Sequence, residues 1–369
     1  MTVAVLYQED LKEYDFGSGH PFHGDRYAAF MELLKQRFPA DSAYKVLKAE
    51  KADNQDLALI CDEDYINFSR EYYHAMAAGW MGYYENVPRY QSVDNKPIGT
   101  PGEVEQAARI IVGQAKTACD LVQSGQYNKV ISIGGGMHHA KRRFGEGFCI
   151  YNDVAFAALY LIEKYALKRV LVLDTDAHAG NGTSEYFRGN PNVLFIDIHQ
   201  DPNTIYPGTG FVQDVGVESA KGLSLNIPMP IHSGNASYMA AFDQIVLPVT
   251  REYKPQIIIR NGGSDPHFND GLTYLGMTVA GFKQMGEKVR QMAEVSGGKM
   301  IDMIASGYNP KVLPHCWLSL LSGVADFPIS VEEPVPVPPQ FEQDQILAKT
   351  LEILEDVRRY QKDYWKSLT

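Results

Sequence analysis

Residues 169–182 read Arg-Val-Leu-Val-Leu-Asp-Thr-Asp-Ala-His-Ala-Gly-Asn-Gly. The first part is a short apolar run, which between helical segments indicates a parallel strand buried on both faces. The second part is a polar loop whose glycines permit close backbone approach. In open α/β sheets, ligands bind beyond the carboxyl ends of the strands. The stretch therefore predicts a buried strand that delivers polar side chains to a functional edge.

Short apolar runs recur along the chain. Two segments, 26–38 and 102–123, carry apolar residues at helical spacing. Alternating strands and helices predict an α/β sandwich with one central, mostly parallel sheet. The other predicted strands are residues 3–7, 129–133, 193–198, 223–227, 256–260 and 300–305.

The C-terminal part differs in composition from the rest of the chain. Residues 328–339 contain five prolines, which predict a stiff, extended connector. A last helix is predicted over 342–366, where it docks on the body of the protein or on another subunit of a homo-oligomer. We therefore expect a catalytic domain at 1–327 and a Pro-rich connector with a C-terminal helix at 328–369.

Composition and charge exclude several classes of protein. The 369 residues include 34 Lys and Arg and 45 Asp and Glu, a net charge of −11. This balance speaks against direct nucleic-acid binding and suits a cationic partner. No run approaches the ~18 apolar residues of a membrane span, and the first ten residues lack a signal-peptide pattern. Four cysteines without a C-x-x-C pair indicate reduced thiols, so we expect a cytoplasmic protein without membrane contact.

Three residues after predicted strands suit a metal ion. Asp176 and His178 are two residues apart, and on an extended chain both side chains leave the same face. Asp265 follows another predicted strand and is the natural third ligand. Two carboxylates and one histidine suit zinc first, with iron, cobalt or manganese as alternatives. Three protein ligands leave room for water and substrate, as in catalytic sites. The simpler alternative is a solvated turn.

Other polar residues could perform acid–base chemistry. His138 and His139 follow three glycines, and histidine suits proton transfer at a metal-bound water near neutral pH. They could instead be metal ligands or capping residues. Tyr308 stands in a loop after a strand, where a phenol can donate a hydrogen bond to a developing oxyanion. Among the remaining histidines, His199 and His267 are expected nearest to the site.

Together these motifs resemble the zinc-dependent histone deacetylase superfamily. That group includes bacterial and archaeal histone-deacetylase-like proteins, acetoin-utilisation proteins and acetylpolyamine amidohydrolases. The resemblance extends from Tyr14 to Trp317, most of the chain. Its motifs are GGMHHA (135–140), GFCIYND (147–153), DTDAH (174–178), YPGTG (206–210), SDP (264–266) and GY (307–308).

The resemblance implies a fold and a metal. The fold is an arginase/deacetylase-like three-layer α/β/α sandwich. One catalytic Zn2+ is held by Asp176, His178 and Asp265, with Fe2+ or Co2+ as substitutes. The metal and a histidine activate a water, which attacks the carbonyl carbon of an amide.

Roles for further residues also follow from the resemblance. His139 matches the general base, and His138 matches the partner that helps to place the water. Tyr308 matches the tyrosine that stabilises the tetrahedral oxyanion. Asp174 matches a carboxylate that orients a histidine, and Asn181 matches the position behind the second histidine.

The substrate channel is assigned in the same way. Gly147, Phe148 and Tyr206 match the walls of a narrow tube that holds an acyl-lysine stem. The acidic clamp for the substrate backbone falls near Glu85 and Asn86.

Several positions depart from the family pattern. Asn181 replaces the aspartate of some members, which is expected to tune the pKa of the base. Ala179 stands where many members have a histidine, and Tyr206 replaces a common phenylalanine. Asp197 falls where a serine often lies beside a structural K+. Residues 304–307 replace a glycine-rich run, so a stiffer loop is expected.

The leading functional hypothesis is a deacylase, acting first on acetyl groups, of lysine side chains in peptides or proteins or of related N-acyl amines. A close rival is an acetylpolyamine amidohydrolase, which a narrowed, dimeric entrance would favour. A third reading is a non-catalytic sensor of an acylated ligand. An arginase-type ureohydrolase with two manganese ions is disfavoured, because Gly180 stands where the bridging aspartate should be.

Overall fold

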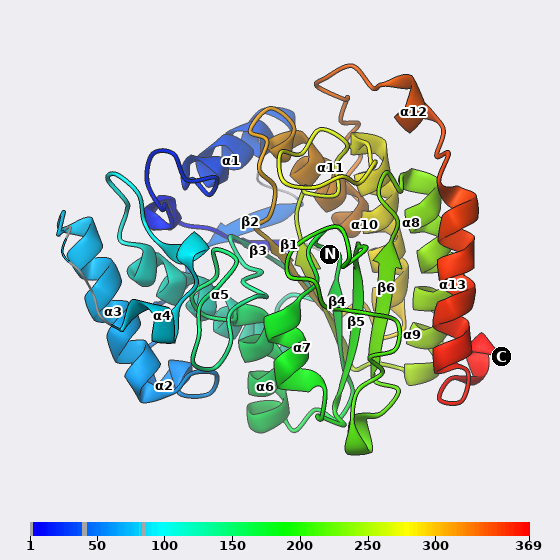
Figure 1. Cartoon of the computed structure of the whole chain (residues 1–369), viewed down its shortest axis with the longest axis horizontal. Coiled ribbons are helices and arrows are strands. Elements are labelled where there is room, and N and C mark those ends of the chain that lie inside the picture. Colours follow the sequence, from blue (N-terminus) through cyan, green and yellow to red (C-terminus); the bar gives the residue numbers. More distant parts are fainter. Residues whose placement is uncertain (1–2, 39–42, 81, 83–85) are drawn as a thin grey trace.

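A single parallel sheet forms the centre of the molecule (Figure 1). The computed structural model describes residues 3–38, 43–80, 82 and 86–369. The eight strands among them run in the order β2-β1-β3-β8-β7-β4-β5-β6, and each neighbouring pair is parallel. The strands are β1 (Val3–Leu6), β2 (Tyr44–Leu47), β3 (Lys129–Ile133), β4 (Val170–Asp174), β5 (Val193–Gln200), β6 (Ser224–Met229), β7 (Ile257–Gly262) and β8 (Met300–Ile304).

The structure confirms all seven predicted strands. They could be recognised because a strand in a sheet that is covered on both faces is an uninterrupted apolar run. The prediction missed β2, which lies at one edge of the sheet beside β1. Its four residues alternate little and only Tyr44 is buried. An edge strand with such a pattern carries too weak an apolar signal to be recognised.

Helices cover the sheet on both faces, so the predicted α/β sandwich is confirmed (Figure 1). On one side α5 packs on β3 and β8, and α6 packs on β4 and β7. On the other, α10 packs on β7 and contacts α11, which contacts α1. The α-helices are α1 (Asp25–Arg37), α2 (Asn54–Leu57), α3 (Glu63–Ala77), α4 (Val87–Tyr90), α5 (Val104–Gln123), α6 (Asp153–Tyr165), α7 (Asn181–Phe187), α8 (Asn235–Ala241), α9 (Leu247–Tyr253), α10 (Val279–Glu294), α11 (Leu313–Ala325), α12 (Pro339–Glu342) and α13 (Leu347–Gln361).

The C-terminal helix α13 docks on the body of the same chain. It lies along β6 and α8 and buries Leu354 and Val357 there. The indole of Trp365 donates a hydrogen bond to the Gly222 carbonyl at 2.9 Å.

The division at residue 327 stays a prediction. Within the described ranges, no helix is both long and apolar enough to cross a membrane.

The strand order explains how distant loops meet. The neighbours β3, β8, β7 and β4 lie in the middle of the sheet, and their carboxyl ends share one edge. The loops after these strands carry the predicted functional residues. They begin at residues 134, 305, 263 and 175. Parallel pairing therefore gathers segments more than a hundred residues apart at one place.

Candidate active site

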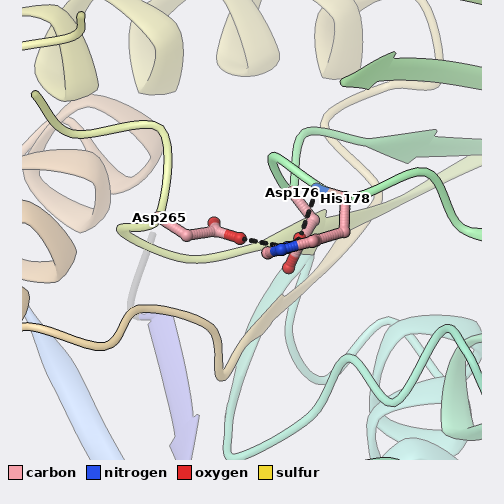
Figure 2. A group of neighbouring side chains, drawn as sticks. All are labelled: Asp176, His178 and Asp265. Atoms are coloured by element: carbon pink, nitrogen blue, oxygen red, sulfur yellow. Dashed lines mark hydrogen bonds and ion pairs between the residues drawn. The ribbon is translucent and has the colours of Figure 1, made fainter. Parts of the chain in front are cut away.

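A buried Asp–His–Asp group lies at this edge of the sheet (Figure 2). Asp176 and His178 come from the loop after β4, and Asp265 comes from the loop after β7. Their potential ligand atoms all lie within 4.8 Å of one another. The Nδ1 atom of His178 is 3.1 Å from Oδ1 of Asp176 and 3.2 Å from Oδ2 of Asp265. The three predicted ligands therefore converge on one point.

The loop after β4 bends where the sequence suggested an extended chain. The Asp174 carboxylate accepts a hydrogen bond from the Asp176 backbone N–H at 3.0 Å. The Asp176 carboxylate in turn accepts one from the His178 backbone N–H at 2.9 Å. Carboxylates that bond the backbone two residues on stabilise turns. The two side chains are thus brought together by a turn and not by strand alternation.

The charges of this group call for a cation. Burial opposes a charge on His178, but hydrogen bonds to Asp176 and Asp265 outweigh it and raise the His178 pKa to about 10. Burial, and then the charge of Asp176, raise the pKa of Asp265. Two carboxylates buried together are stable only with a compensating positive charge. The donor set and its electrostatics fit a divalent metal ion, and it is the one such group found among the described residues.

Asp265 is held by neighbours that the sequence did not reveal. The Ser306 hydroxyl donates to Oδ1 of Asp265 at 2.8 Å, and the Ala177 backbone N–H donates to its Oδ2 at 3.2 Å. Ser306 belongs to the segment that replaces a glycine-rich run. Its side chain therefore ties the loop after β8 to the loop after β7.

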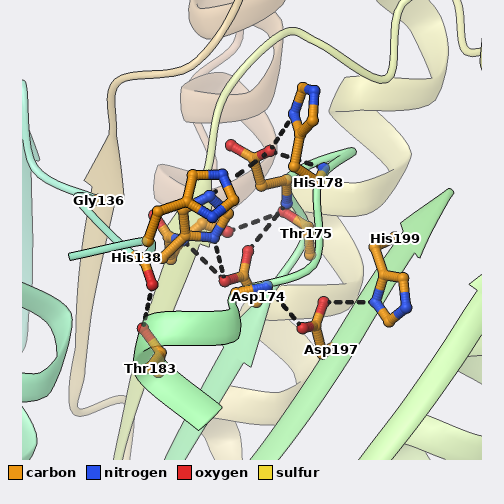
Figure 3. Close-up of polar contacts among 12 residues, drawn as sticks. Gly136, His138, Asp174, Thr175, His178, Thr183, Asp197 and His199 are labelled. Atoms are coloured by element: carbon orange, nitrogen blue, oxygen red, sulfur yellow. Dashed lines mark hydrogen bonds and ion pairs between the residues drawn. The ribbon is translucent and has the colours of Figure 1, made fainter. Parts of the chain in front are cut away.

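His138 pairs with a carboxylate (Figure 3). Its Nδ1 donates to Oδ2 of Asp174 at 2.7 Å, and the Asn261 side chain donates to the same oxygen at 3.0 Å. The Nε2 atom lies 3.8 Å from the Asp176 carboxylate. Burial opposes a charge on His138, but the negative charges of Asp174 and Asp176 raise its pKa to about 9. The pairing with Asp174 thus favours the protonated form of His138.

His139 pairs with an amide. Its Nδ1 lies 2.7 Å from Oδ1 of Asn181. Burial, followed by the positive charges of His138 and His178, lowers the pKa of His139 well below its usual range. The rings of His138 and His139 lie with centroids 4.0 Å apart. Both adjacent histidines thus reach the site, and their pKa values are shifted in opposite directions.

Asp153 fixes the backbone that presents the two histidines. Its carboxylate accepts hydrogen bonds from the backbone N–H groups of Gly136 at 2.9 Å and Met137 at 2.7 Å. Burial raises the pKa of Asp153 to about 6. Asp153 lies in a motif that the sequence flagged, but its partners become visible only in the fold.

Tyr308 lies beside the Asp–His–Asp group. Its ring centroid is 6.4 Å from that of His178, and its backbone N–H donates to the Asp270 carboxylate at 2.8 Å. Burial, and then the negative charges of Asp176 and Asp265, raise the Tyr308 pKa. The phenol therefore keeps its proton and remains a hydrogen-bond donor.

The predicted channel residues surround the histidine and the tyrosine. The ring of Phe148 lies 5.7 Å from that of Tyr308, and the ring of Tyr206 lies 5.1 Å from that of His139. Gly147 has φ +58°, and a Cβ there would lie 2.1 Å from the His139 ring. A side chain at this position would therefore displace His139. Tyr206 is 42% exposed and faces the outside.

The predicted acidic clamp is not located by the structure. Glu85 lies outside the described residues, and Asn86 directly precedes α4. Asp94 instead contacts the channel wall, because its carboxylate accepts the Gly147 backbone N–H at 2.9 Å. Sequence reasoning missed Asp94.

The two other histidines expected near the site have partners of their own. His199 is fully buried, with Nδ1 2.8 Å from the Asp197 carboxylate and Nε2 2.9 Å from the Gly210 carbonyl. Both of these partners only accept hydrogen bonds. Despite burial, the negative charge of Asp197 raises the His199 pKa. His267 pairs with Glu333 of the Pro-rich connector at 2.9 Å.

Asp197 and Gly180 bear on two further predictions. The Asp197 carboxylate accepts hydrogen bonds from His199 and from the Gly180 backbone at 2.9 Å, so the protein itself supplies its partners. A structural K+ beside Asp197 stays a prediction. A Cβ at Gly180 would lie 2.5 Å from the Asp174 carboxylate. The bridging carboxylate of an arginase-type second metal has no room there.

Comparison with known proteins agrees with this arrangement of fold and site. The histone deacetylase domain family matches residues 20–324. A probable deacetylase of Archaeoglobus fulgidus is 30% identical over 99% of both chains. The acetoin utilization protein AcuC of Bacillus subtilis is 32% identical over 85% of this chain and 79% of its own length. The crystal structure of the HDA15 HD domain superposes with a TM-score of 0.82 at 25% identity, covering 100% of this chain and 97% of that one.

The chain is thus an α/β protein with a candidate metal centre at the carboxyl edge of a parallel sheet. It belongs to the histone deacetylase family. Membership of this family makes it an amidohydrolase that removes acyl groups.

Proposed function

We propose that this protein is a zinc-dependent deacylase that removes an acyl group, first of all acetyl, from lysine side chains or related N-acyl amines. The observation that carries the proposal is the convergence of Asp176, His178 and Asp265 within 4.8 Å, beside one histidine that pairs with a carboxylate and one that pairs with an amide. This combination provides a metal site, a base and a cation in one place.

Zinc is the proposed metal because two carboxylates and one imidazole form a common catalytic zinc site, in which Fe2+ or Co2+ can substitute. When bound, zinc supplies Lewis-acid polarisation of the acyl carbonyl and lowers the pKa of a water. Asp176, His178 and Asp265 would hold it.

The chain's own residues divide the proton and charge work. Nε2 of the neutral His139 accepts the proton of the attacking water. His138 stays cationic through Asp174 and stabilises negative charge nearby. The protonated phenol of Tyr308 donates a hydrogen bond to the oxyanion of the tetrahedral intermediate.

The substrate class is proposed from the channel. Phe148 beside Tyr308, Tyr206 beside His139 and a Gly147 that packs on the His139 ring suit an extended aliphatic stem that carries the acyl group. The net charge of −11 suits a cationic peptide or amine.

Acylated polyamines remain the alternative substrates. A non-catalytic sensor and a homo-oligomer are further proposals. A cytoplasmic location is supported by four free, buried cysteines.

The test is acetate release from an N-acetyl-lysine peptide by the zinc-loaded protein, with N-acetylated polyamines assayed in parallel. Asp176→Ala should abolish turnover and zinc binding. Tyr308→Phe should keep zinc and lower kcat on the order of 10²- to 10³-fold, as for loss of one oxyanion donor. Stoichiometric zinc without turnover on either substrate class would refute acetyl removal, and the same result with longer acyl groups would refute the deacylase and favour the sensor.

A further inference from the structure

Asn181 connects the proposed base to a carboxylate farther out. Its Oδ1 lies 2.7 Å from Nδ1 of His139, and its Nδ2 donates to Oε1 of Glu146 at 2.8 Å. Lys141 places its ammonium group 2.8 Å from the same Glu146 oxygen. Three side chains and a counter-ion thus form one chain of hydrogen bonds that leads away from the site.

The orientation of the Asn181 amide follows from this chain. A carboxylate only accepts hydrogen bonds, so the NH2 group of Asn181 must face Glu146. The carbonyl oxygen then faces His139, and Nδ1 of the histidine must carry the hydrogen. In a neutral imidazole, Nε2 is then left without a proton and can accept one.

Without Glu146, nothing described here would fix the orientation of the Asn181 amide. An asparagine amide can turn over and present either its oxygen or its NH2 group. If the NH2 group faced His139, Nδ1 would accept and Nε2 would carry the proton. Such a histidine could not act as a base at Nε2.

We propose that Glu146 is a positioning residue for the catalytic base. Through Asn181, it holds His139 as the Nδ1–H tautomer with Nε2 free. The inference rests on the proposed function only in taking His139 as the base; the tautomer itself follows from the hydrogen bonds.

The contrast with His138 shows what the intervening amide achieves. His138 bonds the carboxylate of Asp174 directly. His139 bonds the Asn181 amide, so the carboxylate of Glu146 lies one residue farther away. Glu146 therefore orients the ring of His139, as a directly bonded carboxylate would. Because the Asn181 amide lies between them, no carboxylate sits beside His139 to favour its protonation.

The first experiment compares Glu146→Ala and the isosteric Glu146→Gln with a matched control. Glu185 is the control because its exposed carboxylate lies 3.9 Å from the same Lys141 ammonium, whereas the Asn181 amide bonds Glu146. Glu146→Ala should lower kcat on the order of 10- to 100-fold, as is typical for partners that orient a catalytic group. KM should change little, and Glu146→Gln should fall in between. A kcat for Glu146→Ala equal to that of Glu185→Ala would overturn the proposal.

The second experiment reverses the sign of the effect. Asn181→Asp places a carboxylate directly behind His139, where it only accepts and so fixes Nδ1–H without help. Glu146 then faces a like charge, so Glu146→Ala should leave kcat unchanged or raise it in that background. A loss as large as in the Asn181 background would show that Glu146 acts by another route.

The third experiment reads the tautomer without turnover. Two-bond 15N–1H spectra of zinc-loaded, 15N-histidine-labelled protein distinguish Nδ1–H from Nε2–H, and His139→Ala assigns the signal. We expect Nδ1–H in the unsubstituted protein and a mixture in Glu146→Ala. An unchanged tautomer in Glu146→Ala would overturn the positioning role. Inactivity on every acyl amide, with the tautomer shift present, would instead refute the proposed function alone.

Discussion

His138 and His139 are neighbours in the chain and in space, yet their pKa values are shifted in opposite directions. Both are almost fully buried, at 2% and 4% exposure. Burial alone lowers the pKa of any histidine, so it cannot separate them. One difference is the partner of Nδ1, which is the Asp174 carboxylate for His138 and the Asn181 amide for His139; the charge of Asp176 adds to the first and the charges of His138 and His178 to the second.

The two partners come from the same loop. Asp174 ends β4, and Asn181 begins α7 seven positions later. One loop therefore assigns both roles, a fixed cation and a free base. Residue type suggests acid–base chemistry, but the hydrogen-bond partner decides which of the two histidines performs it.

The largest expected effect comes from removing the neutral histidine. His139→Ala should lower kcat on the order of 10²- to 10⁴-fold, the usual contribution of a general base. His138→Ala should cost less, because its ring supplies charge and does not accept the proton. Acetate release with zinc-loaded protein measures both. His74→Ala, exposed on α3, is the control. If His138→Ala proved the more damaging, the two roles would have to be exchanged.

The next largest effect is expected on the stability of the protein when the carboxylate partner of His138 is removed. Asp174→Asn replaces that carboxylate with an amide, the kind of partner that His139 has. Breaking a buried ion pair from one side should lower the free energy of unfolding by about 3 kcal/mol. Urea unfolding of the zinc-loaded protein measures it.

The matched control for Asp174→Asn is Asp243→Asn, which removes an exposed carboxylate from its pair with Lys288. An exposed pair is worth no more than about 1 kcal/mol. Equal losses for the two variants would show that Asp174 is not needed to hold a charged His138.

Much of the sheet and of the candidate site could be predicted from the sequence. Each buried strand is an apolar run, and the residues that follow it stand out by type, so Asp176, His178 and Asp265 could be named in advance. Parallel strands that end at one edge bring their loops together, and the turn after β4 then aligns Asp176 with His178. The family resemblance then supplied His138, His139 and Tyr308 with roles, which stay proposals.

The missing parts depend on contacts that no spacing encodes. Glu146 meets Asn181 across 35 positions, and Asp270 meets the Tyr308 backbone across 38. Inside the sheet, Arg260 pairs with Asp302 on the neighbouring strand, although both fall within apolar runs. An acidic residue in a loop looks the same in the sequence whether it faces water or a buried amide. Only the fold distinguishes the two.

The smallest effect is expected for a substitution that gives His139 a carboxylate partner, as His138 already has. Asn181→Asp places a carboxylate beside Nδ1 of His139, and a carboxylate favours the imidazolium form and raises the histidine pKa. The base works only when it is neutral. In the unsubstituted protein the lowered His139 pKa puts the acid limb of kcat/KM below pH 6.5, the ordinary histidine pKa. In Asn181→Asp that limb should move to higher pH by about one unit.

Profiles of kcat/KM against pH measure the shift, with Asn190→Asp as the control. Asn190 lies beyond α7, and its Oδ1 accepts the Asn192 backbone N–H at 3.0 Å, a role that aspartate keeps. Both variants add one negative charge, so a shift that appears in both would reflect overall charge. A shift confined to Asn181→Asp would locate the cause at His139. If the acid limb of Asn181→Asp stayed in place, or moved to lower pH, the neutral state of His139 could not be attributed to its amide partner.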